Sequence, residues 1–279
     1  MLTDEPKNSY DCWNHEPYEW RSAYMTKARI SVLLIALLVI CLLLPVPAGA
    51  KKVRWHRPWE FNLAPFYLWA VGIDGEQTIG PKTTGIEVAF EDVFDRLNAA
   101  FTGHFEGMYK KRYGFLFDYN FINLAADKSV PVLGTVDFDF KAQIGEGAFL
   151  YRFLRRQAHY TEAIFGARYT SLDNDLKING TSVLDGIKTW TDPIVGLRWV
   201  WNFSDAWSLR VRGDAGGFGA GSDLALQGLL IFEWGPARHV SFLGGYRALY
   251  QDYEEGSGPT FFKYQAVMHG PVLGINFRW

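Results

Sequence analysis

Apolar and polar residues alternate along most of the chain between residues 59 and 279. Every odd position from 195 to 203 is apolar or aromatic, whereas the even positions include Gly196, Arg198 and Asn202. The segments 113–121, 207–212 and 273–279 follow the same rule, and in 224–234 the even positions other than Gly228 are apolar. Successive side chains of a strand point to opposite faces, so each segment predicts a strand with one apolar and one polar face. After residue 50 there is no apolar run of 18 residues that would predict a transmembrane helix.

The alternation predicts an all-β chain that forms a transmembrane, antiparallel, up-and-down β-barrel. Ten strands are expected, an even number as in single-chain bacterial barrels, with eight and twelve as alternatives. Their ranges are 59–73, 99–110, 113–127, 134–153, 159–173, 188–203, 206–217, 222–235, 239–254 and 264–279.

Lipid is the favoured partner of the apolar faces. The segments often exceed twelve residues, whereas strands of soluble domains average about five or six. Aromatic residues gather near the segment ends, as in the girdles of membrane barrels. A soluble β-sandwich or a lipocalin-like barrel is the alternative.

The connections give a second test of the strand assignment. If both termini face the periplasm, the connections after the second, fourth, sixth and eighth strands should be short, and all four are. The longest connections, 74–98 and 174–187, then fall on the extracellular side.

Three places depart from simple alternation. Around Gly145–Gly147 the apolar positions change from even to odd, which predicts a β-bulge. Residues 84–90 alternate like an additional strand. The first long loop should also contain a short amphipathic helix, packed on the rim or plugging the lumen, because its apolar residues follow helical spacing: Phe90, Val93, Phe94, Leu97 and Phe101.

The N-terminal region predicts export. Residues 25–50 combine the basic Lys27 and Arg29, an apolar run from Ile30 to Leu44, and Ala48-Gly49-Ala50 as a cleavage site. An uncleaved anchor helix is the alternative. Residues 1–24 are interpreted as a non-native or disordered extension ahead of Met25, and residues 51–279 as the barrel.

Composition limits the chemistry. The formal net charge is −2, which gives no basic footprint for nucleic acid. Cys12 and Cys41 both precede residue 51, so the expected barrel has no disulfide, thiolate metal site or cysteine nucleophile. No cofactor or metal is predicted.

The polar faces predict a charge network across the lumen, because a barrel of about eight to ten strands is narrow enough for its own side chains to fill. Arginines and carboxylates would pair bidentately there, and a narrow water-filled pore of mixed charge is the alternative. His104 and Lys141 are also placed inside. The residues expected to form the network are Glu106, Asp118, Glu146, Glu162, Arg168, Asp192, Arg198, Arg210, Arg212, Asp214 and Arg247.

The C-terminal segment GPVLGINFRW resembles the assembly signal of Gram-negative outer-membrane proteins, with Ile275, Phe277 and Trp279 as its alternating apolar positions. The phrases WEFNLAPFYLWAVGIDG, GDAGGFGAGSD and GYRALYQDYEEG resemble small barrels of the OmpA and OmpW type. The resemblance implies an outer-membrane location, contact with lipid and lipopolysaccharide, and recognition by the barrel-assembly machinery. It implies no reaction.

The predicted function is therefore a structural barrel or a narrow, porin-like channel for small solutes. The alternatives are a barrel enzyme that hydrolyses lipids or peptides and a surface-binding barrel. His269 near Asp252 or Glu254 is the one constellation that would suit an enzyme. The glycine-rich run Gly213–Ser222 predicts a tight extracellular turn rather than a phosphate loop.

Overall fold

The computed structural model describes residues 58–88, 97–130, 134–178 and 181–279. The expected N-terminal extension, 1–24, and the expected signal peptide, 25–50, lie outside these residues. Within the described part of the chain, no helix is long and apolar enough to cross a membrane.

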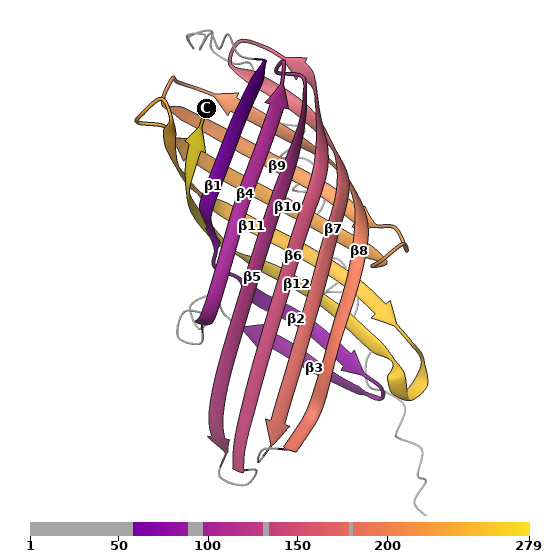
Figure 1. Cartoon of the computed structure of the whole chain (residues 1–279). Coiled ribbons are helices and arrows are strands. Elements are labelled where there is room, and N and C mark those ends of the chain that lie inside the picture. The colour runs from indigo at the N-terminus through magenta and orange to yellow at the C-terminus, as the bar shows by residue number, and fades with distance from the viewer. Residues whose placement is uncertain (1–57, 89–96, 131–133, 179–180) are drawn as a thin grey trace, which may run out of the picture. The chain divides into compact units, whose positions relative to one another are not determined.

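The chain forms one antiparallel sheet of twelve strands, in the order β1-β4-β5-β6-β7-β8-β9-β10-β11-β12-β2-β3 (Figure 1). Pairing of β1 with β12 closes ten of them into a barrel, and β2 and β3 form an additional hairpin beside β12. The strands are β1 (Trp59–Trp69), β2 (Gly72–Ile79), β3 (Lys82–Val88), β4 (Leu97–Tyr109), β5 (Tyr113–Val130), β6 (Gly134–Arg155), β7 (His159–Ile178), β8 (Thr181–Asn202), β9 (Trp207–Gly217), β10 (Leu224–Trp234), β11 (Val240–Glu255) and β12 (Phe262–Arg278).

The predicted ten-stranded antiparallel barrel is confirmed, with one change at its start. The segment 59–73 is two strands, because the chain leaves β1 at Trp69 and begins β2 at Gly72. The candidate strand at 84–90 corresponds to β3. β2 and β3 lie outside the closed ring and do not enlarge it.

The hairpin of β7 and β8 is longer than predicted. β7 runs to Ile178 and β8, with 22 residues, begins at Thr181, so the predicted loop 174–187 is wrong. The loop was predicted because apolar alternation fades there. Backbone pairing continues there without this alternation, since Leu176 of β7 still pairs with Leu184 of β8.

A β-bulge occurs in β1, where none was predicted. The register of β1 against β12 shifts between Leu63 and Phe66. After the shift Phe66 is 71% exposed on the outside, whereas Tyr67 is 4% exposed and points inward. The odd positions from 59 to 73 are therefore not one face, although all of them are apolar.

The predicted bulge at Gly145–Gly147 is wrong. β6 keeps an unbroken register with β5 throughout, and with β7 as far as Arg152. Ile144 and Ala148 are both buried inside the barrel, so the even positions face the lumen on both sides of this point. The apolar pattern changes parity because the lumen itself becomes apolar. Lys141, expected inside, is consequently exposed on the outer face.

The expected amphipathic helix is not confirmed. Phe90, Val93 and Phe94 lie outside the described residues, whereas Leu97 and Phe101 belong to β4. Phe101 is 60% exposed on the outer face of the strand.

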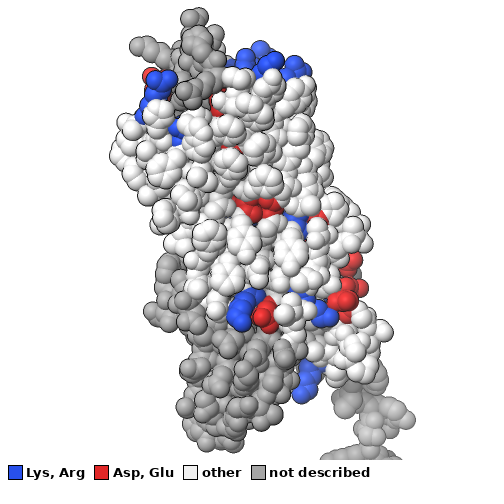
Figure 2. Space-filling view, in the orientation of Figure 1, with Lys and Arg blue, Asp and Glu red and all other residues white. Residues whose placement is uncertain are grey.

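The outer face is rich in large apolar side chains. Phe117, Phe149 and Phe165 are exposed on neighbouring strands. In Figure 2 much of this surface carries no charge, while basic side chains gather at the upper end. The turns at the end of the barrel that carries Trp279 include Lys110–Arg112, between β4 and β5, and Arg156, between β6 and β7. These turns are short, as predicted.

Candidate functional site

The barrel brings the predicted lumen residues together from seven strands, β4 to β9 and β11. Parity places each of them on the inner face, because strict alternation carries through these strands. All are buried, apart from the Arg210 side chain, which is 14% exposed. The placed residues are Glu106, Asp118, Glu146, Glu162, Arg168, Asp192, Arg198, Arg210, Arg212, Asp214 and Arg247.

Glu146 lies at the centre of one group of ion pairs. Its Oε1 accepts hydrogen bonds from Arg168 Nε at 2.9 Å and from Arg247 Nη2 at 2.8 Å. Its Oε2 accepts a third from Arg212 Nη2 at 2.7 Å. A single carboxylate thus joins β6 to arginines of β7, β9 and β11, across the lumen.

The same arginines hold further carboxylates. Arg247 Nη1 donates to Asp118 at 2.9 Å. Arg168 and Arg212 both contact Asp214, at 2.5 and 2.8 Å. The arginines are thus shared between carboxylates of β5, β6 and β9.

A second group forms around Glu106 and Glu162. Arg198 pairs with both carboxylates, at 2.7 Å to Glu162 Oε2. Arg152 pairs with Glu162 at 2.8 Å, and Arg210 lies 3.7 Å from Glu106. These residues link β4, β6, β7, β8 and β9.

His104 connects the two groups. Its Nδ1 is 3.0 Å from Asp118 Oδ2 and its Nε2 is 2.8 Å from Glu106 Oε1. The ring also lies beside Tyr67, with 5.4 Å between the ring centroids. The two groups therefore form one continuous array, called the charge network below.

Two lumen residues of the charge network had not been predicted. Arg152 pairs with Glu162, and Glu233 accepts a hydrogen bond from Ser241 at 2.5 Å and lies 3.5 Å from Arg210. Both sit at inward positions, so the same parity rule would have found them. Asp192 was predicted to belong to the network. It lies inside the barrel, but it accepts a hydrogen bond from the backbone N–H of Ser222, at 2.6 Å.

The charges of the network balance. Buried charges are tolerated when they are paired and hydrogen-bonded, and arginine suits this because its donors form a rigid fork. Six arginines face six carboxylates: Arg152, Arg168, Arg198, Arg210, Arg212 and Arg247, with Glu106, Asp118, Glu146, Glu162, Asp214 and Glu233.

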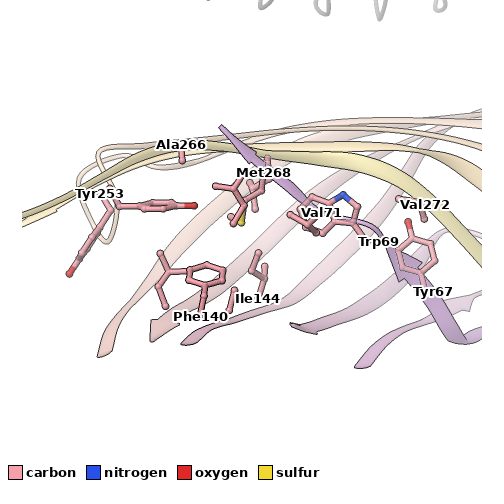
Figure 3. Packing of buried hydrophobic residues seen from close by; sticks show 14 of the residues in the cluster. Tyr67, Trp69, Val71, Phe140, Ile144, Tyr253, Ala266, Met268 and Val272 are labelled. Atoms are coloured by element: carbon pink, nitrogen blue, oxygen red, sulfur yellow. The ribbon is translucent and has the colours of Figure 1, made fainter. Parts of the chain in front are cut away.

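Apolar side chains fill the lumen on either side of the charge network. Met108, Leu116 and Leu150 form a buried cluster nearer the end that carries Trp279. The larger cluster lies toward the opposite end and is called the distal apolar layer. In Figure 3, Phe140 and Ile144 face Val71 and Met268 across the lumen. The layer includes Trp69, Val71, Ile73, Phe140, Ala142, Ile144, Leu172, Trp190, Tyr253, Tyr264 and Met268.

The predicted assembly-signal residues lie at the C-terminal end of the barrel wall, in β12 and at Trp279 directly after it. Phe277 and Trp279 are exposed on the outer face, and Ile275 pairs with Phe66 of β1. The backbone N–H groups of Phe61 and Trp279 donate to each other's carbonyls, at 3.0 and 3.2 Å. The C-terminus thus closes the barrel against β1.

His269 does not form the predicted pair with Asp252 or Glu254. Its Nε2 is 2.6 Å from Asp74 Oδ2, and its Nδ1 is 2.6 Å from the Tyr246 hydroxyl. β2 supplies this carboxylate, and sequence reasoning had placed residue 74 in a loop. Within the described part of the chain, no group of three or more His, Cys, Asp or Glu could hold a metal ion.

The glycine-rich run Gly213–Ser222 ends β9 and turns toward β10. Gly217 and Gly219 have φ values of +89° and +75°, which L-residues with side chains rarely adopt. The run thus contains the predicted turn.

Comparison of the fold with solved structures supports the barrel class. The outer-membrane protease OmpT from Escherichia coli superposes with a TM-score of 0.53 at 8% identity, covering 83% of this chain and all of that one. This likeness concerns the fold alone. The attachment invasion locus protein Ail of Yersinia pestis gives 0.36 at 11% identity, covering 80% of this chain and all of Ail. No family model and no curated protein sequence matches the chain.

Proposed function

We propose that the chain is an integral outer-membrane β-barrel of a Gram-negative bacterium, in which the charge network seals the lumen. In this proposal residues 25–50 are a cleaved signal peptide. The protein is then a structural barrel rather than an open channel. The observation that carries the proposal is the interlocking of six arginines with six carboxylates across the barrel.

The outer face supports a membrane environment. Phe66, Phe101 and Leu273 are each at least 60% exposed, and water would penalise such a surface. Lipid chains and lipopolysaccharide are the proposed surroundings. The short turns beside Trp279 would face the periplasm, and the long strands β5 to β8 would project outside the cell.

The barrel-assembly machinery is the proposed partner during insertion. Ile275, Phe277 and Trp279 occupy the strand that must pair with β1 to close the barrel. A machinery that binds this strand first would hold it until β1 arrives. The narrower OmpA or OmpW type stays a prediction.

A sealed lumen is favoured over a narrow solute channel. A solute would have to separate Glu146 from Arg168, Arg212 and Arg247, all of which are buried. It would then pass the distal apolar layer, whose side chains offer a polar solute few hydrogen bonds to replace those that it makes with water. Small solutes are therefore not the proposed cargo.

We also propose that the protein is not an enzyme. The contacts of His269 with Asp74 and Tyr246 tie β12 to β2 and β11, which is a structural role. His269→Ala should leave any lipid or peptide hydrolysis by the purified protein unchanged. Hydrolysis that disappears in this variant would favour the enzyme alternative.

Two measurements test the proposal. Outer membranes should contain the protein, and it should migrate faster on a gel before boiling than after, as folded barrels do. Liposomes that contain it should not swell in small sugars. Recovery in the soluble fraction would contradict the membrane assignment, and swelling would contradict the sealed lumen.

A further inference from the structure

Five basic residues gather in two neighbouring turns at the end of the barrel that carries Trp279. One turn joins β4 to β5 and the other joins β6 to β7. The two turns lie side by side, because β5 pairs with β6 and the backbone N–H of Arg152 donates to the carbonyl of Arg112 at 2.8 Å. Figure 2 shows basic side chains gathered at this end. We call the set the basic arc, which comprises Lys110, Lys111, Arg112, Arg155 and Arg156.

Carboxylates near the basic arc do not balance its charge. Lys111 Nζ lies 3.0 Å from Glu60 Oε1, which is an ion pair. Arg112 Nη2 donates to Tyr151 at 3.0 Å, and this acceptor is a hydroxyl rather than a carboxylate. Within the described residues, no cation of the arc except Lys111 forms an ion pair. The other four are exposed, so their charges are available to an anion from outside the barrel.

An apolar, aromatic wall adjoins the basic arc. Tyr113, Phe149 and Phe153 are exposed on the outer faces of β5 and β6, directly beside the two turns. Arg112 connects the charged and apolar surfaces, because its guanidinium lies 5.8 and 5.6 Å from the ring centroids of Tyr113 and Tyr151. In membrane barrels, aromatic side chains mark the interface between headgroups and hydrocarbon. In the proposed membrane location, the arc therefore lies at the level of the lipid headgroups.

The turn between β8 and β9, at the same end of the barrel, lacks this charge. Residues 203–206 include Asp205 and no lysine or arginine. The aromatic wall nevertheless continues there, since Trp207 and Trp234 are exposed and stack with 5.9 Å between their ring centroids. Positive charge thus does not accompany the aromatic wall everywhere but is concentrated on the side formed by β4 to β7.

We propose that the basic arc binds the headgroup of an anionic phospholipid in the leaflet on the periplasmic side. Arginine donates paired hydrogen bonds to phosphate oxygens, and lysine attracts them as a point charge. The acyl chains of the same molecule would extend along Phe149 and Phe153. A lipid is favoured over an acidic protein because it meets the cations and the adjoining apolar wall at once. The inference rests on the proposed membrane location and orientation but not on the sealed lumen.

Lipid titrations followed by native mass spectrometry test the proposal. The full chain in detergent micelles would be titrated separately with phosphatidylglycerol and with phosphatidylcholine of identical acyl chains. Phosphatidylglycerol carries a net negative charge, whereas phosphatidylcholine is zwitterionic. The first bound phosphatidylglycerol should have an affinity about fivefold above that of phosphatidylcholine, the effect expected from one cation at a membrane surface. Equal affinities would overturn the proposal and would favour an acidic periplasmic protein as the partner.

Two triple variants with the same loss of charge test whether binding occurs at the arc. The first combines Arg112→Gln, Arg155→Gln and Arg156→Gln, and it should bring the ratio of the two affinities close to one. The control should keep the ratio, because its substitutions lie toward the opposite end of the barrel: Lys141→Gln, Lys188→Gln and Lys263→Gln. An unchanged ratio in the arginine variant, or an equal fall in both variants, would contradict binding at the arc.

Two further measurements separate electrostatic binding from folding. Exposed charges are screened by salt, so the preference for phosphatidylglycerol should shrink when NaCl rises from about 0.05 M to about 0.5 M. A preference that salt does not change would contradict a headgroup site made of exposed cations. Gel migration before boiling reports separately whether each protein is a folded membrane barrel. A failure of the proposed membrane location is thereby distinguished from a failure of this inference.

Discussion

The charge network and the distal apolar layer line the same lumen but are stabilised in opposite ways. In the network, Glu146 is held by three arginines through directed hydrogen bonds. In the distal layer, Leu172 and Met268 are almost completely buried and contribute through close packing. Removing a group from the network leaves charges without partners, whereas removing one from the layer leaves a cavity.

This difference explains where the inward face was recognisable in the sequence. Beside the charge network a polar inner face alternates with an apolar outer face. Beside the distal apolar layer both faces are apolar, so alternation loses its meaning. A membrane barrel can therefore show a clear period of two in one half of a strand and lose it in the other.

The largest effect should come from Glu146→Ala. Arg168, Arg212 and Arg247 would each lose a buried partner, which should lower the free energy of unfolding by about 3–5 kcal/mol. Urea unfolding in lipid vesicles measures this. The control is Asp173→Ala, which removes an exposed partner of Lys141 and should cost less than about 1 kcal/mol. If Glu146→Ala and Asp173→Ala lowered the free energy of unfolding equally, the ion pairs of the network would be no stronger than an exposed pair.

Leu172→Ala probes the distal apolar layer. Leu172 has no exposed surface, so its truncation should cost about 3 kcal/mol through lost packing and a residual cavity. Unlike Glu146→Ala, it should create no unpaired charge and no ion leak. Ile187→Ala, at an exposed position of the neighbouring strand β8, is the matched control and should change little. Ion leakage through the Leu172→Ala variant would contradict the expected difference between the charge network and the distal apolar layer.

Leu197→Arg tests the outer face against the inner one. Arginine near mid-membrane on a lipid face costs about 2–4 kcal/mol, so the folded fraction in outer membranes should fall. Ser208→Arg should be milder, because Ser208 points inward and lies 3.4 Å from Glu233. Similar losses for both variants would undo the assignment of faces.

The smallest effect is expected at the tip of the β11–β12 hairpin. Lys188 and then Tyr253 donate hydrogen bonds to Glu255, which holds the pKa of this carboxyl below its usual value. A lowered pKa stabilises the fold above the unfolded-state pKa, and this contribution is lost as the pH falls through the folded value. The side chains of Lys188 and Glu255 are both partly exposed. Glu255→Gln should therefore lower the free energy of unfolding by at most about 0.5 kcal/mol at pH 7. The cost should shrink as the pH falls through the folded-state pKa of Glu255, and a cost that grows in acid would contradict this sign.

Much of the barrel could be predicted because its outer face is apolar and much of its inner face is charged, so alternate residues meet opposite demands. Glu106, Arg198 and Arg212 were placed inside on this ground alone. The bulge beside Phe66 was missed, since every odd residue around it is apolar and only the exposure of Phe66 and Leu68 reveals the change of face. At Gly145–Gly147 the opposite happened: a bulge was predicted where the strand register is continuous.

The partners within the network were harder to predict than its members. Parity tells which side chains enter the lumen but not how far along the barrel each one lies. Barrel stagger decides that Arg168 reaches Asp214, 46 residues away in sequence, and that Asp192 instead binds the Ser222 backbone. The same limit applies to His269, whose partner Asp74 comes from the additional hairpin beside the barrel.

Planar-bilayer conductance of the wild-type protein beside Glu146→Ala tests the sealed charge network most directly. The wild-type protein should insert and remain silent, while the variant, still migrating as a folded barrel before boiling, should show ion leakage. Discrete openings of the wild-type protein at the same level as the variant would contradict a lumen closed by paired arginines and carboxylates.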